Sequence, residues 1–345
     1  MEMAAGVIAA KARSMMGRQL VQADYEELSH KRSVAEIASY LKNATSYGSA
    51  LKDVRENHIH RGQLEDLLRK ENFRKSMKLF RYSESSQQPY YLLYMQQIEI
   101  DLILSRIRVL ISQSFDSAIV EFPIFLKKYT SYDLEKLGNV RSYDDLLDVV
   151  KKLMYYDVLL PYRVKKGEES SIAYAKIETA LQKQFYEHAM KTISKVLKGS
   201  SRKQCRELYA MQAELSNIEK IYRLKKYFDI REDVIAKALV PIQCRISKTK
   251  LDELLACSLP QFIKQLETGP YHLALEGRED VFIEHYTEAY LYNYAKKNIF
   301  FASEASTVYS SYLIMMDREL KNIVHIIEGV RYQLSSEEIL AMLVY

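Results

Sequence analysis

The chain has 345 residues, with 50 Lys and Arg against 45 Asp and Glu and a formal net charge of +5. This mild, well-mixed charge argues against a nucleic-acid-binding protein, which would carry a sharper basic bias. Ten glycines and six prolines are few for this length, and long stretches without a helix breaker favour an all-α fold.

The sequence also indicates where the protein works. No uncharged apolar run reaches the roughly 18–20 residues of a membrane span, so any membrane contact is expected to be peripheral. The first residues, with only Ala4–Ala10 apolar, are not typical of a signal peptide. Cys205, Cys244 and Cys257 have no paired spacing, which predicts neither a disulfide framework nor a metal site and is typical of the cytoplasm.

Ala4–Leu20 reads as a first helix, and it leads into a stretch that the chain repeats, Leu20–Leu51. Asp24 is expected to cap a short helix with Glu27 three residues on, and Ser33 with Glu36 has the same capping-box spacing. Tyr47-Gly48 then interrupts the pattern. The stretch therefore predicts two short helices joined by a tight corner, and we call it a corner segment.

Two further corner segments are predicted at Tyr129–Leu160 and Lys248–Leu275. Five residues of the first recur in the second at an offset of 109, namely Asp133, Leu137, Ser142, Leu146 and Tyr156 for Asp24, Leu28, Ser33, Ile37 and Tyr47. In the third, Ser258, Leu259, Phe262 and Leu266 match at an offset of 225, and the tyrosine falls at Tyr271. A period of about 110 residues is too long for a solenoid repeat, so the pattern indicates a triplicated helical unit.

Two helical patterns follow each corner segment. The first of each pair covers His60–Tyr82, Ile172–Leu197 and Val281–Ser303, and the second covers Gln88–Ser112, Gln204–Phe228 and Thr307–Leu334. The last has apolar residues spaced four and three apart, at Tyr309, Leu313, Met316, Leu320, Ile323, Ile327 and Val330, which predicts a buried seam. Most of this seam recurs 105 residues earlier, whereas Glu99 and Arg106 interrupt it in the first unit.

The repeat predicts three similar helical-bundle units, 1–115, 116–232 and 233–345. Lead-in helices are expected at Ser117–Lys128 and Val234–Ile246, bent or beginning at Pro123 and Pro241. Polar loops are expected at Ser83–Gln88, Arg163–Ser171 and Lys198–Lys203. Glu214-Leu-Ser-Asn217 matches Glu319-Leu-Lys-Asn322, with Asp101 assigned to the asparagine's place in the first unit. Each asparagine borders the seam and is expected to fix the packing register through an interhelical hydrogen bond.

The segment His60–Arg81 is locally basic. Its basic residues are Arg61, Arg69, Lys70, Arg74, Lys75, Lys78 and Arg81, against Glu65, Asp66 and Glu71. Such a segment is either an ordinary exposed helix face or a docking face for an acidic partner or an anionic membrane surface.

Residues that could carry chemistry are sparse. His58 and His60 lack a third ligand at a recognisable spacing, and His285 with Glu288 resembles only half of a di-iron motif. The chain contains no phosphate-binding glycine loop and no nucleophile elbow. The sequence therefore predicts a protein that is not an enzyme, with no catalytic, cofactor-binding or metal-binding residues to assign.

The opening KARSMMGRQLVQADYEELSHKRSVAEIASYLKNATSYGSAL (residues 11–51) resembles the start of the C subunits of V/A-type rotary ATPases, called d subunits in eukaryotes. The three-unit order and the late Glu-Leu-Lys-Asn-Ile helix are similar as well. The resemblance implies three bundles in a pseudo-threefold, funnel-like arrangement. It implies a non-catalytic central-stalk protein on the cytosolic face, a socket between the shaft made by the D and F subunits and the membrane proteolipid ring.

Other readings of the sequence remain open. A freestanding helical scaffold or adaptor would have the same composition, and a metal-dependent helical-bundle enzyme would carry histidines and carboxylates on its helices. Binding to a coiled-coil shaft protein separates the first reading from the rotor protein, and metal analysis tests the second. The resemblance is compatible with either H⁺ or Na⁺ as the transported ion.

Overall fold

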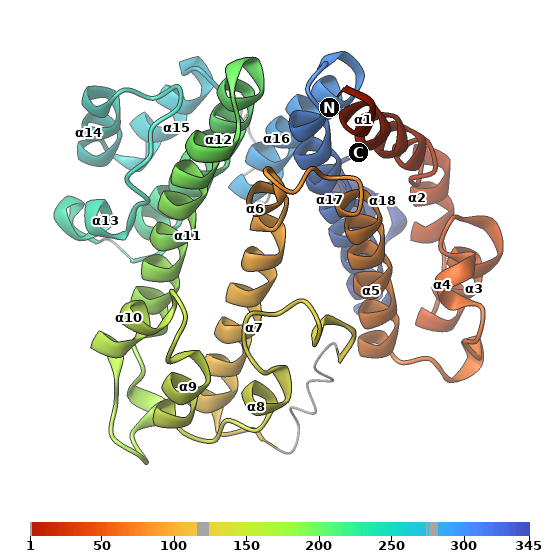
Figure 1. Ribbon diagram of the computed structural model, residues 1–345, viewed down its shortest axis with the longest axis horizontal. Coiled ribbons are helices and arrows are strands. Elements are labelled where there is room, and N and C mark those ends of the chain that lie inside the picture. The colour runs from red at the N-terminus through yellow and green to blue at the C-terminus, as the bar shows by residue number, and fades with distance from the viewer. Residues whose placement is uncertain (1, 116–123, 229, 274, 276–281) are drawn as a thin grey trace.

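The computed structural model describes residues 2–115, 124–228, 230–273, 275 and 282–345. Every regular element in these ranges is a helix, and they contain no strand. The prediction of an all-α fold is therefore confirmed. Figure 1 shows long helices through the middle of the molecule, with clusters of short helices packed around them.

Three long hairpins form the frame, one for each pair of predicted helical patterns. The first joins α5 (Arg61–Phe80) to α6 (Gln88–Tyr91) and α7 (Leu93–Ser112), the second joins α11 (Tyr174–Val196) to α12 (Gly199–Phe228), and the third joins α16 (Ile283–Phe301) to α17 (Ala305–Arg331). One expected loop is wrong, because residues 199–203 are the first turn of α12 rather than a linker. Gly199 begins that helix with a φ of +55°, which glycine adopts without steric cost, so the reversal needs only Leu197 and Lys198.

The corner segments fold as short helices with tight breaks. The first contains α2 (Gln22–Ser29), α3 (Val34–Ala44) and α4 (Gly48–Leu51), followed by η1 (Glu56–His58); the second contains α8 (Leu134–Gly138), α9 (Tyr143–Val150), α10 (Tyr156–Leu159) and η3 (Leu160–Tyr162), followed by η4 (Glu169–Ser171); the third contains α14 (Lys248–Ala256) and α15 (Leu259–Thr268). Ser33 and Ser142 accept backbone N–H bonds as predicted helix caps. A short C-terminal helix, α18 (Ser336–Ala341), packs against α2 and α17.

The prediction that Asp24 is the N-cap of the first short helix is wrong. Val21 is the N-cap of α2, and the Asp24 carboxylate accepts the Val21 backbone N–H at 2.8 Å from the third helical position. Asp24 also accepts the Tyr40 hydroxyl at 2.8 Å. Asp24 therefore caps the helix start from within the first turn, where its negative charge also interacts favourably with the helix dipole.

The lead-in elements differ more from expectation. α1 (Glu2–Met16) is a full helix that packs on α17 and α16. α13 (Glu232–Ala238) ends before Pro241 rather than bending or beginning there, because proline lacks the N–H that a helix interior needs. In the second lead-in segment, Ser117–Lys128, the described residues hold only η2 (Ile124–Leu126), and Pro123 lies outside the described residues.

α17 is the central helix of the molecule. It packs against α16, α1, α5 and α12, and its residues from Ala305 to Leu313 are all buried. The predicted seam is confirmed at five of its seven positions, which are at most 5% exposed, whereas Leu320 and Val330 are half-buried. α17 is therefore covered on more sides than the one-faced stripe that the spacing predicts, because four helices pack on it, although Lys321 remains exposed.

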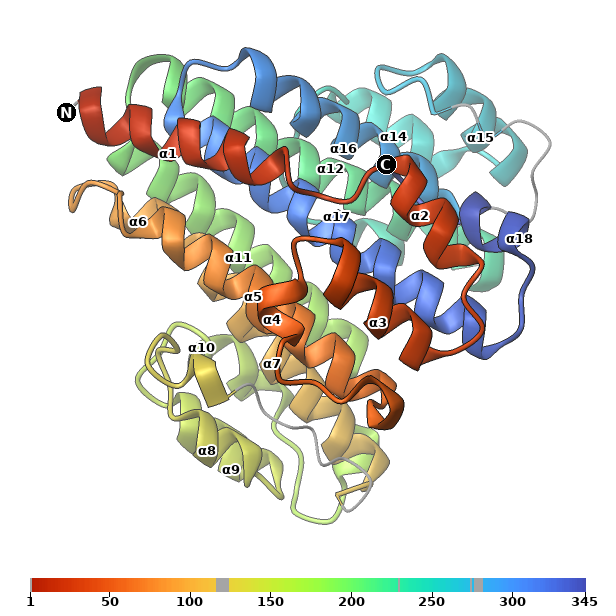
Figure 2. The ribbon, with the colours of Figure 1, turned by 90° about the vertical axis from the view of Figure 1, so that its right-hand side faces the viewer.

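The three hairpins meet at one end. The Tyr90 hydroxyl oxygen lies 3.1 Å from the Cys205 sulfur, 3.0 Å from the Ser306 carbonyl oxygen and 2.5 Å from the Ser310 hydroxyl oxygen. These residues come from α6, α12 and α17, one helix of each hairpin. We call this end, which carries the turns at 81–87, 197–198 and 302–304, the hairpin end; it lies on the left in Figure 2, with α6 and the N-terminus.

Candidate functional site

A buried glutamate on a long helix fastens each corner segment. Glu319 of α17 is 3% exposed and accepts two bonds from the first corner segment, from the Tyr47 hydroxyl at 2.6 Å and from the Leu20 backbone N–H at 2.7 Å. Tyr47 is fully buried. A buried carboxylate costs several kcal/mol unless donors replace its water, so this pair defines where the first corner lies.

The third corner segment is fastened in the same way to α12. Glu214 is 4% exposed and accepts the backbone N–H groups of Cys244, Arg245 and Ile246 at 2.9, 2.8 and 3.1 Å. It also accepts the Tyr271 hydroxyl. One carboxylate thus satisfies three consecutive backbone donors ahead of α14 and one side chain after α15, which holds both ends of the corner.

The second corner segment is fastened to α7. Glu99 is 2% exposed and accepts the Tyr155 hydroxyl at 2.6 Å and the backbone N–H of Ser131. The Tyr132 hydroxyl donates to the Glu99 carbonyl oxygen at 2.9 Å. Each of the three long helices therefore presents one buried glutamate to one corner tyrosine, and we call these three pairs the corner joints.

The three corner joints connect the corner segments and the long helices in a closed order, because the first corner is held by the last long helix. Tyr155 and Tyr271 follow their glutamates by 56 and 57 residues, so the second and third corners pack on the long hairpin that comes before each in the chain. No such hairpin comes before the first corner, and its tyrosine bonds instead to Glu319, 272 residues later. The last long helix thus holds the first corner segment.

The electrostatics of the joints suit structural bonds rather than proton transfer. Burial raises the pKa of the Tyr47, Tyr155 and Tyr271 hydroxyls well above their usual range, and the partner glutamates raise it further. Each hydroxyl therefore stays protonated and acts as the hydrogen-bond donor to its glutamate. Burial also raises the pKa of Glu319, while the charge of Lys75, whose ammonium lies 4.6 Å from the centre of the Tyr47 ring, lowers it.

Two positions in the predicted repeat register are wrong. Tyr155 rather than Tyr156 is the counterpart of Tyr47, because Tyr155 is the one that reaches a buried glutamate. Glu99 corresponds to Glu214 and Glu319, which places Leu102 rather than Asp101 opposite the asparagines. Glu99 looked like an interruption of the apolar seam, and its buried place in the seam is the signal that could have identified the joint.

The two asparagines also fasten backbone, but not between helices as predicted. Asn217 exchanges two bonds with Val240, at 2.8 and 2.9 Å. Asn322 does the same with Val344, at 2.7 and 3.1 Å. Val240 and Val344 lie outside helices, so the amide replaces a missing partner strand for an extended segment. The predicted interhelical hydrogen bond is therefore wrong, and each asparagine instead holds an extended segment on its long helix.

The predicted histidine candidates do not converge. His58 and His60 are exposed on either side of the buried Ile59. Glu288 accepts bonds from Arg318 and, at 2.9 Å, from Lys321, and so serves an ion-pair cluster between α16 and α17. Within the described ranges, no group of three or more His, Cys, Asp or Glu side chains is placed to hold a metal ion.

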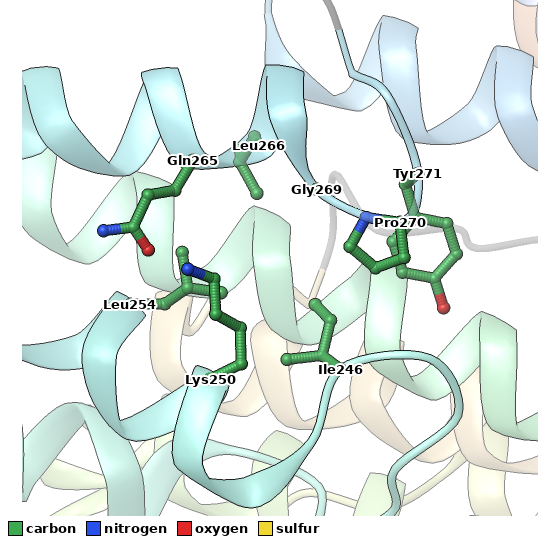
Figure 3. Close-up of a pocket in the computed structure, with 8 residues that line it drawn as sticks. All are labelled: Ile246, Lys250, Leu254, Gln265, Leu266, Gly269, Pro270 and Tyr271. Atoms are coloured by element: carbon green, nitrogen blue, oxygen red, sulfur yellow. The ribbon is translucent and has the colours of Figure 1, made fainter.

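A small recess lies in the third corner beside Tyr271. Figure 3 shows it between Lys250 and Leu254 of α14 and Gln265 and Leu266 of α15. It has room for no more than about one water molecule. Its place inside the corner makes it part of the packing around the joint rather than a ligand site.

The basic segment His60–Arg81 forms most of α5. Lys70, Arg74, Lys78 and Arg81 are exposed and recur every three or four residues, which places them on one side of the helix. Arg74 forms two bonds, of 2.7 and 2.6 Å, with the buried carboxylate of Glu71. In the described part of the chain, Lys70, Lys78 and Arg81 are in no ion pair, so they supply the positive charge of this face.

None of the described helices is long and apolar enough to cross a membrane. The described residues that stand out are the buried corner joints, which hold together an all-α body of long hairpins, as expected of a structural subunit.

A sequence model of the family described as ATP synthase (C/AC39) subunit matches residues 8–342. The chain therefore belongs to this family, the C or d subunits of V/A-type rotary ATPases. No curated protein matches the chain by sequence.

Proposed function

We propose that this chain is the central-stalk subunit of a V/A-type ATPase, a non-catalytic socket that couples the shaft made by the D and F subunits to the proteolipid ring of the membrane. It would transmit torque between them on the cytosolic face. Membership of the C/AC39 family, over nearly the whole chain, makes it a rotary ATPase subunit. The finer role is our proposal.

The closed cycle of corner joints is the observation that carries this proposal. Three long helices each hold a corner segment, and the first corner is held by the last helix. We infer three repeat units, 1–115, 116–232 and 233–345, in a pseudo-threefold, funnel-like arrangement. A part that passes torque must resist deformation, and buried carboxylate joints between units restrict their relative movement.

We further propose that the exposed basic face of α5 docks on an acidic partner within the complex. Lys70 and Lys78 are the residues to test, because Arg74 is held by Glu71 and its reversal would also leave a buried carboxylate unpaired. The variant Lys70→Glu/Lys78→Glu should assemble poorly. Lys151→Glu/Lys152→Glu makes the same charge change at exposed positions of the second corner and should assemble normally.

The decisive experiment is co-expression with the shaft and ring proteins, followed by isolation of the complex. The rotor subunit should be recovered with both partners in stoichiometric amounts. Recovery with neither would favour the alternative, a freestanding helical scaffold or adaptor. Equal complex yield from the α5 variant and its control would remove the docking face while leaving the rotor role intact.

A further inference from the structure

We propose that the hairpin end binds an anionic phospholipid surface, with Phe300 and Phe301 entering the interfacial layer and the basic residues around the α11–α12 turn contacting headgroup phosphates. This inference rests on the proposed function and deepens it. It assigns the face that the subunit turns toward the membrane, and a bilayer as one of its partners.

The first observation is charge. Segment 191–206, which contains the α11–α12 turn, holds six basic residues and no acidic one: Lys191, Lys195, Lys198, Arg202, Lys203 and Arg206. All six are exposed, and none forms an ion pair with another described residue. In a chain with a net charge of only +5, this is a local surplus of positive charge, and such clusters attract anionic lipid.

The second observation is an exposed aromatic pair. Phe300 and Phe301 end α16 with 55% and 80% of their surfaces exposed, and their ring centroids lie 6.5 Å apart. Lys296 and Lys297, also exposed, lie on the preceding turn of the helix. A single exposed apolar side chain needs no explanation. Two adjacent phenylalanines beside lysines have the composition of an interfacial membrane anchor.

These two features occupy the same end of the molecule. The turns after α11 and α16 touch, because Ser200 donates to Glu304 and Ser201 shares a hydrogen bond with Ser306. The third turn adds the exposed Arg81 and Tyr82. Figure 2 shows the turns together at the left-hand edge. A membrane surface that approaches from this side would therefore face all three turns.

The far end of α12 offers a contrast. Tyr227 and Phe228 are exposed there as well, and the exposed Lys226 lies beside them, with its ammonium 5.5 Å from the centre of the Tyr227 ring, but the charge around this pair is mixed. The Lys225 ammonium donates to the Leu255 and Cys257 carbonyl oxygens at 2.6 and 2.7 Å, and Glu232 and Asp233 follow closely in the chain. At the hairpin end the aromatic pair instead lies near six exposed basic residues of a segment without an acidic one, and that combination favours lipid over water.

A lipid surface fits this end better than a protein partner. The basic residues are spread around the tips of two hairpins rather than gathered at one point. Lipid phosphates move laterally and adapt to such a field, each lysine near an anionic surface strengthening binding roughly fivefold. Phenylalanine rings gain from a hydrocarbon boundary, which a polar protein loop does not offer.

The test uses the full chain and vesicles of phosphatidylcholine, with or without 30% (about one lipid in three) phosphatidylglycerol, in a sedimentation assay. The protein should bind the anionic vesicles, release them as salt rises, and ignore the neutral ones. Lys195→Glu/Lys198→Glu/Lys203→Glu and Phe300→Ser/Phe301→Ser should each lower the partition coefficient by roughly tenfold or more. Circular dichroism checks that both remain folded.

Two matched controls keep the test sharp. Tyr227→Ser/Phe228→Ser removes another exposed aromatic pair, at the opposite end of α12. Lys151→Glu/Lys152→Glu/Lys166→Glu reverses the same number of exposed charges in and just after the second corner segment. Both should bind vesicles like the parent chain. Equal losses in controls and test variants would overturn the assignment of the hairpin end.

Failure of this inference is distinguishable from failure of the rotor role. Assembly with purified shaft and ring proteins in detergent needs no bilayer. If the chain assembles there but shows no preference for anionic vesicles, the lipid contact is wrong and the rotor role stands. If the hairpin-end variants lose the detergent complex instead, a ring protein rather than lipid is the partner of this face.

Discussion

The hydroxyl of Tyr47 donates a hydrogen bond of 2.6 Å to the carboxylate of Glu319, across 272 residues of chain. Both side chains are buried, and the same pairing recurs between Tyr155 and Glu99 and between Tyr271 and Glu214. The same kind of hydrogen bond therefore holds each corner segment on its long helix, and removing it tests how much it contributes to stability.

We expect Tyr47→Phe to destabilise the protein by about 1–3 kcal/mol, because the buried Glu319 loses one of its two donors from the first corner. The ring itself stays, so the apolar packing is preserved. Denaturant unfolding followed by circular dichroism measures the change. Tyr332→Phe, at a residue that is 71% exposed, is the control and should unfold like the parent. A Tyr47→Phe midpoint equal to the parent's would mean that the bond contributes nothing.

Asp317 should make the protein less stable as pH rises. Burial raises the pKa of Asp317 to about 6 from an ordinary 3.8, although the Tyr94 hydroxyl donates to it at 3.0 Å. As the pH rises from about 4 to about 6, this carboxyl ionises in the unfolded chain but stays protonated in the folded protein. The free energy of unfolding therefore falls over this range and has lost the full contribution above about pH 6. Relative to the parent, Asp317→Asn should gain on the order of 2 kcal/mol between pH 4 and 7.5.

The measurement is a series of denaturant unfolding curves across that pH range. Asp53→Asn provides the control, because the Asp53 side chain is 89% exposed. A constant difference between Asp317→Asn and the parent at every pH would contradict the prediction.

Glu288 should act in the opposite direction. Burial alone would raise the pKa of Glu288, but the hydrogen bond from Arg318 and the charges of Lys321 and Arg318 bring it down to about 2. The folded state therefore favours the ionised form, and this stability is present above about pH 4.5 and lost as pH falls toward 2. Glu288→Gln should cost on the order of 1–3 kcal/mol at pH 7 and progressively less at pH 4 and below.

Unfolding curves of Glu288→Gln between pH 3 and 7 test this trend. Glu253→Gln removes the carboxylate of a surface ion pair with Lys250, whose glutamate is 55% exposed, and should change stability little. A penalty for Glu288→Gln that grew as the pH fell would have the wrong sign.

Gly48 should not tolerate a side chain. A Cβ atom there would lie 2.6 Å from the backbone carbonyl oxygen of Lys42, and one at Gly269 would lie 2.7 Å from that of Gln265. Gly48 follows α3 and Gly269 follows α15, each where the chain passes close to the helix it has just left. Gly48→Ala should destabilise the protein by about 1–3 kcal/mol, because backbone has to shift. Gly62→Ala, with open space around the new atom, should be neutral or stabilising in α5.

Residue periodicity accounts for the part of the fold that could be predicted. The seam of α17 and the serine caps of α3 and α9 follow from spacings of three and four along one helix, and they are confirmed. The corner joints could not be found in this way, because each connects a helix to a segment 56, 57 or 272 residues away. Helix periodicity has no information about such partners.

The same limit explains the errors of register. Tyr155 and Tyr156 are neighbours, and an offset of 109 selects the second, whereas burial against Glu99 selects the first. A glutamate within an apolar stripe reads as a defect of the stripe, although here it is the residue to which the corner attaches. The α5 face was identified by composition, yet only the bonds from Arg74 to Glu71 separate its bound charge from its free charge.

The bond between Tyr47 and Glu319 sets an order of events during synthesis. A ribosome adding roughly 5–20 residues per second needs about ten seconds to a minute to travel from one partner to the other. The second corner can settle on α7 soon after it emerges, and the third on α12. The first corner segment must wait until α17 has been made. Until then Leu28, Ile37 and Leu41, which are fully buried in the finished protein, lack the helix that covers them. Of the three corner segments, the one made first is thus the last that can dock, and its apolar side chains stay exposed for longest while the chain is translated.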